Sequence, residues 1–88
     1  MSMESTKNVI EIVKKASNQF EYEEHYYFTE VAIVEGKTKI LFTGDIWNAT
    51  RFNNMTDIEQ DAWYRFIKSI LGKHYEITIK TISLTYNI

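Results

Sequence analysis

Histidines and neighbouring carboxylates are the residues of this chain whose types could do acid–base or metal chemistry. His25 and His74 lie far apart, and no histidine, cysteine or aspartate stands at ligand spacing beside either. A zinc site needs three or four converging ligands. Asp57 and Asp61 are one helical turn apart, but the favourable position of an acid at a helix start and an i,i+4 pair between Asp61 and Arg65 explain them. These residues predict neither a metal site nor a catalytic one.

Other catalytic motifs are also missing from the sequence. Gly36, Gly44 and Gly72 are isolated and form no phosphate-binding loop, no serine stands in a nucleophile elbow, and there is no cysteine. We therefore expect a protein that is not an enzyme and that uses no cofactor and no metal.

An acidic and aromatic segment is the strongest indication of binding. Residues 21–35 contain five glutamates and no lysine or arginine, although the net charge of the whole chain is only −2. Tyrosines are favoured at binding hot spots, and carboxylates steer association with a basic surface. On what we expect to be an edge strand, we predict a partner-binding site at Glu21, Tyr22, Glu23, Glu24, Tyr26 and Glu30.

This segment favours a non-enzymatic domain that binds a protein with a basic surface. Because basic surfaces often bind nucleic acid, the sharpest form of the hypothesis is an inhibitor of a nucleic-acid-handling enzyme. Its general character is that of small anti-defence proteins, such as anti-CRISPR or anti-restriction proteins, although no motif identifies such a family. The alternative interpretation of the glutamates is an ordinary solvated face that protects an edge strand from aggregation.

Two other binding functions stay open. Aromatic side chains on a small sheet can stack bases, but a pI of about 5.6 is low for a nucleic-acid-binding domain, so nucleic acid is not the expected partner. Self-association through an uncovered sheet face or a regular last strand would give a homodimeric structural or adaptor protein.

Two amphipathic helices are expected to support these residues. In residues 6–18, Val9, Ile12 and Val13 follow the spacing of one buried helical stripe. A second helix is predicted from a capping box formed by Thr56 and Glu59 up to a C-terminal glycine, Gly72.

The remaining segments favour extended structure. Residues 20–35, with a break near Glu23-Glu24, and residues 38–43 form two strands around a hairpin turn at Glu35-Gly36-Lys37. Both faces of residues 26–34 are partly apolar, so either face could meet the core. Residues 75–86 form the last strand, whose apolar phase changes near Lys80-Thr81, and either a β-bulge there or two short strands would explain the change.

The order α-β-β-α-β predicts one α+β domain over residues 1–88. Its simplest form is a small two-layer domain with an antiparallel sheet of three or four strands and both helices on one face. No apolar run approaches the roughly 20 residues that a membrane-spanning helix needs, so we expect no membrane association. A cysteine-free chain without a recognisable targeting segment suits the cytoplasm.

Overall fold

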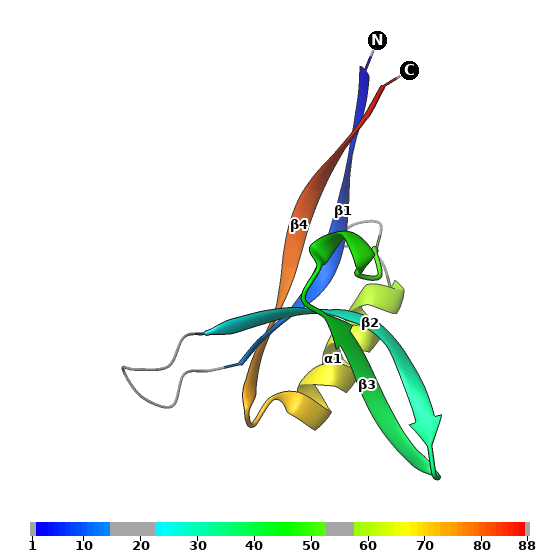
Figure 1. The fold of residues 1–88 in the computed structure, drawn as a ribbon, viewed down its shortest axis with the longest axis vertical. Coiled ribbons are helices and arrows are strands. Elements are labelled where there is room, and N and C mark those ends of the chain that lie inside the picture. The colour runs from blue at the N-terminus through cyan, green and yellow to red at the C-terminus, as the bar shows by residue number, and fades with distance from the viewer. Residues whose placement is uncertain (1, 15–22, 53–57, 88) are drawn as a thin grey trace.

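In the computed structural model of the protein, four strands form one antiparallel sheet that is covered by an α-helix (Figure 1). The structure describes residues 2–14, 23–52 and 58–87. In chain order the elements are β1 (Ser2–Lys14), β2 (Glu24–Val34), β3 (Lys37–Thr43), the 3-10 helix η1 (Ile46–Asn48), α1 (Ile58–Leu71) and β4 (Tyr75–Asn87). The strand order in the sheet is β3-β2-β1-β4.

A long ladder between β1 and β4 stands where the first helix was expected. The two strands pair from Ser2↔Asn87 to Lys14↔Tyr75, and each is 13 residues long. The expected α-β-β-α-β order with two helices is therefore wrong. The described residues run β-β-β-α-β, with a single α-helix.

The apolar residues of β1 explain why a helix could be predicted there and why a strand forms. Val9, Ile10, Ile12 and Val13 are all buried. Four apolar residues so closely spaced fit a helical stripe, but they also fit a strand that is buried on both faces. All four are β-branched, and such side chains lose rotamer freedom in a helix while packing well on a pleated surface. The pairing with β4, which is distant in sequence, stabilises the extended conformation of β1.

A β-bulge in β2 determines which of its side chains face the core. The register with β3 shifts between Phe28 and Glu30, so Thr29 is the extra residue. Tyr26 and Phe28 pack in or against the core before the bulge, and Val31 does so after it. The core face changes from even to odd positions at the bulge, which explains why both faces of this segment are partly apolar in the sequence.

β4 contains no such irregularity. Its register with β1 passes through Asn8↔Thr81 without a shift, so the bulge expected at Lys80-Thr81 is wrong, and so is the alternative of two short strands. The apolar phase changes because the two halves of β4 have different surroundings. Ile77 belongs to the core cluster that includes Ile67 of α1, whereas Leu84 is buried outside that cluster. In Figure 1 the C-terminal part of β4 extends with β1 away from the rest of the molecule.

α1 closes the core on one face of the sheet. Ile67 of α1 is fully buried, and Trp63, Tyr64 and Leu71 pack against the same cluster. The core cluster consists of Ile10, Ile12, Phe28, Phe52, Ile67 and Ile77. The helix begins at Ile58 as the structure shows it, and Thr56, the expected capping residue, lies outside the described residues.

One buried amide joins the ladder, the helix and the loop before it. Asn8 Nδ2 donates to Gln60 Oε1 at 2.8 Å, and Asn8 Oδ1 accepts from Thr81 Oγ1 at 2.8 Å. The backbone N–H and C=O of Asn8 pair with the backbone of Phe52 at 2.8 and 2.7 Å. Because buried polar groups are costly when unpaired, this arrangement holds α1 and residue 52 in one position over β1.

The hairpin turn expected at Glu35-Gly36-Lys37 is confirmed. Val34 pairs with Lys37, and the two residues between them have positive φ angles, 52° for Glu35 and 75° for Gly36. A two-residue turn with both φ angles positive favours Asn-Gly, whereas a long side chain is disfavoured at the first position.

Replacing Glu35 should therefore stabilise the protein. We expect Glu35→Asn to raise the free energy of unfolding by about 0.5–1 kcal/mol, because asparagine tolerates the left-handed conformation. Chemical denaturation monitored by circular dichroism measures the change. Glu35→Ala is the control, since it removes the same charge but keeps the unfavourable conformation. Equal stability of the two variants would show that the turn is not strained.

Gly72 should be sensitive to substitution. A Cβ atom on Gly72 would lie 2.4 Å from the backbone oxygen of Lys68, and the Gly72 N–H donates to that oxygen at 2.9 Å. We expect Gly72→Ala to destabilise the protein by about 1 kcal/mol or more, because the helix end must shift. Gly44→Ala is the matched control, since nothing lies within 4 Å of a Cβ there. Equal thermal unfolding midpoints for both variants would contradict the packing at Gly72.

Candidate partner-binding site

Three aromatic side chains from three strands meet at one end of the sheet. The ring of Tyr26 in β2 lies 4.9 Å from that of Phe42 in β3, measured between centroids. Phe42 in turn lies 6.4 Å from Tyr75, the first residue of β4. Although two strands separate β3 from β4 in the sheet, the two side chains make contact, so the sheet curls at this end.

A second ring series continues from the core to the surface of α1. Phe28, which pairs with Phe42 across β2 and β3, lies 5.4 Å from Trp63, and Trp63 lies 5.9 Å from Phe66. Phe28 is buried, whereas Phe42 and Phe66 are each 37% exposed. We call the two series together the aromatic cluster; its members are Tyr26, Phe28, Phe42, Trp63, Phe66 and Tyr75.

A carboxylate is bound directly to the aromatic cluster. The hydroxyl group of Tyr26 donates to Glu24 Oε2 at 2.5 Å. This hydrogen bond, together with partial burial and the negative charge of Glu24, raises the pKa of Tyr26 above its ordinary value. Lys14 of β1 is the cross-strand partner of both Glu24 and Tyr75.

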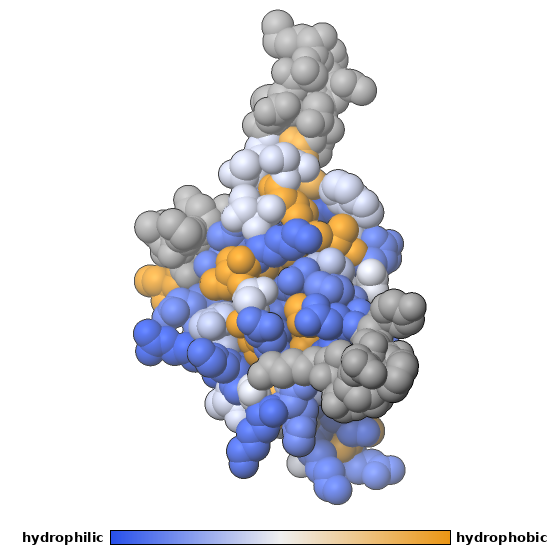
Figure 2. Space-filling model, turned by 90° about the vertical axis from the view of Figure 1, so that its left-hand side faces the viewer, coloured by the Kyte–Doolittle hydropathy of each residue, from blue (hydrophilic) through white to orange (hydrophobic). Residues whose placement is uncertain are grey.

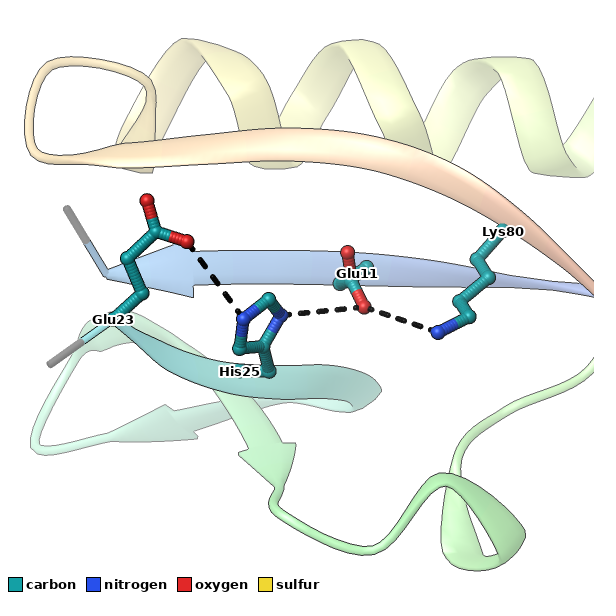
Figure 3. Close-up of polar contacts among 4 residues, drawn as sticks. All are labelled: Glu11, Glu23, His25 and Lys80. Atoms are coloured by element: carbon teal, nitrogen blue, oxygen red, sulfur yellow. Dashed lines mark ion pairs between the residues drawn. The ribbon is translucent and has the colours of Figure 1, made fainter.

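A set of polar and charged side chains that contact one another occupies the other face of the sheet. His25 Nδ1 lies 3.6 Å from Glu11 Oε2, and His25 Nε2 lies 3.8 Å from Glu23 Oε2 (Figure 3). Lys80 Nζ approaches the same oxygen of Glu11 at 3.8 Å. Figure 3 shows these side chains on the side of the sheet away from the helix. Within the described residues, no group of three or more His, Cys, Asp or Glu residues could hold a metal ion.

The structure divides the six residues predicted for partner binding. Glu24 and Tyr26 lie together beside the aromatic cluster. The carboxylate of Glu23 turns to His25 on the opposite face. Glu30 follows the bulge and pairs with Leu41. Leu41 precedes Phe42 in β3, so its side chain points to the opposite face from the cluster. Glu21 and Tyr22 lie outside the described residues.

The expectation that these residues lie on an edge strand is wrong. β2 is an inner strand of the sheet, between β3 and β1. Its first residues, 24–26, pair with β1 but not with β3, because the register with β3 begins at Tyr27↔Thr43. Glu24 and Tyr26 thus lie at one end of an inner strand, where it pairs with β1, and Glu30 lies further along it, where it pairs with β3.

Sequence reasoning missed Phe42, Phe66 and Tyr75 as site residues. Phe42 shares one face of β3 with Ile40 and so resembles a core residue, and Phe66 fits the helical stripe of α1. The contact between Phe42 and Tyr75 depends on the curl of the sheet, which no local pattern displays. On the face shown in Figure 2, hydrophobic and hydrophilic residues form interleaved patches.

The bond between Tyr26 and Glu24 makes a testable prediction about titration. We expect Glu24→Ala to lower the pKa of Tyr26 towards its ordinary value of about 10, because the charged acceptor is lost. The stability that this bond supplies is fully present below that value and is lost as the pH rises through the raised pKa. NMR titration of ¹³C-labelled tyrosine rings measures the midpoint. Glu23→Ala is the control, and a Tyr26 midpoint that moves equally in both variants would contradict the assignment.

Two further observations bear on the class of protein. Among the residues that the structure describes, no helix combines the length and the hydropathy that crossing a membrane requires. In comparisons with known proteins, no family model, no curated protein and no solved structure matches this chain. Function is therefore inferred from the chemistry and geometry of its own residues.

Proposed function

We propose that this chain is a non-enzymatic domain that binds a protein partner through the aromatic cluster and the acidic start of β2. The observation that supports the proposal is the ring series Tyr26–Phe42–Tyr75, with Phe42 partly exposed and Glu24 bonded to Tyr26. Aromatic side chains bury a large area at low entropic cost and dominate binding hot spots. Their contacts with one another hold the rings in place before a partner arrives.

The charges beside the cluster indicate the chemistry of the partner. Glu24 is exposed and bonded to Tyr26 of the cluster, whereas Glu23, next to it in the chain and 63% accessible at its side chain, faces His25 on the opposite side. Carboxylates around an apolar centre steer association and select partners of opposite charge. We therefore infer a partner with lysine or arginine side chains around an apolar recess that accepts Phe42.

An inhibitor of a nucleic-acid-handling enzyme, of the anti-defence type, is the specific form of this proposal. The surfaces on which such enzymes hold phosphates are rich in lysine and arginine, so an acidic domain can occupy them in competition with nucleic acid. The proposal places the protein in the cytoplasm, because a chain without cysteine needs no oxidising compartment to fold.

Capture from a cell lysate with a matched set of variants tests the site. We expect the wild type to retain a protein that Phe42→Ala and the double variant Glu23→Lys/Glu24→Lys both lose. Truncation of a hot-spot residue costs about 2 kcal/mol or more, so the purified partner should bind roughly 30-fold more weakly. The control is Glu30→Lys/Glu35→Lys, which changes the net charge equally outside the cluster and should keep the partner.

The same experiment can overturn the proposal. Circular dichroism first establishes that each variant is folded. Loss of the partner in the control as well would mean that total charge, and not the aromatic cluster, decides binding. Retention by all variants would place the interface elsewhere. Retention of nucleic acid alone, and more of it by Glu23→Lys/Glu24→Lys, would favour a nucleic-acid-binding domain. The inhibitor form further requires that the domain displace nucleic acid from the purified partner.

A further inference from the structure

β4 is an edge strand of unusual length for a small domain. It forms one end of the strand order β3-β2-β1-β4 and runs for 13 residues. Within the described parts of the chain, no strand pairs with its outer side. An edge of this kind presents a row of backbone donors and acceptors that can pair with another strand, and proteins usually interrupt it with charges, proline or bulges. β4 has no bulge in its register with β1 and no proline.

The first half of β4 is complementary to itself. Residues 75–81 read Tyr-Glu-Ile-Thr-Ile-Lys-Thr, with Thr78 at the centre. In an antiparallel pair of two copies with Thr78 opposite Thr78, Glu76 of each copy stands opposite Lys80 of the other. Ile77 likewise stands opposite Ile79. Opposite charges and β-branched pairs at directly opposed positions are the combinations that stabilise neighbouring strands.

Three of the four side chains that such a pair brings together are exposed, and the fourth, Ile77, is buried in the core. Glu76 is exposed and makes no ion pair within the part of the chain that the structure describes. The side chain of Lys80 is 51% exposed and lies 3.8 Å from Glu11, so a second carboxylate can reach it (Figure 3). Ile79 is an exposed apolar residue of this edge, 39% accessible. One unpaired acid, one partly exposed base and an exposed isoleucine are what the self-complementary pattern would bring together.

We propose that two copies of this chain associate through the outer edges of β4, antiparallel and with Thr78 at the two-fold axis. The two sheets then join into one of eight strands, in the order β3-β2-β1-β4 followed by its mirror sequence from the second copy. Because α1 packs on one face of each sheet, both helices lie on the same face of the joined sheet. Tyr75 of the aromatic cluster lies at the end of the paired segment, opposite Thr81 of the second copy, whereas the other members of the cluster lie outside β4. The association does not rest on the proposed partner binding.

Analytical ultracentrifugation of charge-reversal variants tests both the association and its register. The wild type should approach twice the monomer mass of 10.5 kDa as concentration rises. Glu76→Lys and Lys80→Glu each oppose like charges twice, so each should weaken association by about tenfold or more. An equal mixture of the two variants should associate again, because each chain then faces a partner of opposite charge. The double variant Glu76→Lys/Lys80→Glu should also associate as the wild type does.

Several results would overturn this inference. A wild type that stays monomeric excludes the second copy as the occupant of the edge and leaves an extended peptide of another protein. Association that survives Glu76→Lys unchanged places the contact elsewhere or in another register. A mixture of two folded single variants that fails to associate also contradicts the pairing. If Lys80→Glu does not fold, because it puts a second acid beside Glu11, then Glu76→Lys alone decides, with Glu76→Gln expected to associate at an intermediate strength.

Discussion

The ladder between β1 and β4 is the interaction on which the rest of the structure depends. It joins the first and last segments of the chain over 13 residues of each and lets β2 and β3 add to its free side. It places Tyr75 beside Lys14, at the end of the sheet where Phe42 and Tyr26 meet. It also leaves β4 as an open edge. Both the candidate site and the proposed edge pairing follow from this one contact between distant segments.

Buried polar groups hold the ladder in a single register. The side chain of Asn8 bonds to both Gln60 and Thr81, and its backbone pairs with Phe52. A slip of one residue would turn the apolar side chains of β1 to the opposite faces and separate these polar partners. Each buried group left unpaired costs about 1–3 kcal/mol, so the amide favours one register far more strongly than apolar contacts alone. That register also sets which residues of β4 face outward.

Local patterns predicted the parts of the fold that local interactions decide. The hairpin at Glu35-Gly36, the end of α1 just before Gly72 and the position of the last strand all follow from nearby residues. The strand over residues 6–14 does not, because the spacing of its apolar residues suits a helix and a strand alike and the pairing with β4 is non-local. Residues 15–18, the end of the expected helix, lie outside the described residues. The candidate site, like the fold, was predictable only where local sequence decides it. Composition indicated Glu24 and Tyr26, but the bulge that separates Glu30 from them, and the curl that adds Tyr75, depend on tertiary structure.

The most direct test of this account is an NMR measurement of contacts between the two ends of the chain. If β1 and β4 pair as described, nuclear Overhauser effects should connect backbone protons of opposed residues, such as Val9 with Lys80 and Glu11 with Thr78. Amide protons along β1 should exchange slowly with solvent as well. Medium-range nuclear Overhauser effects between residues i and i+3 over residues 6–18, without effects to β4, would show a helix there. That result would remove the ladder, the site and the open edge together.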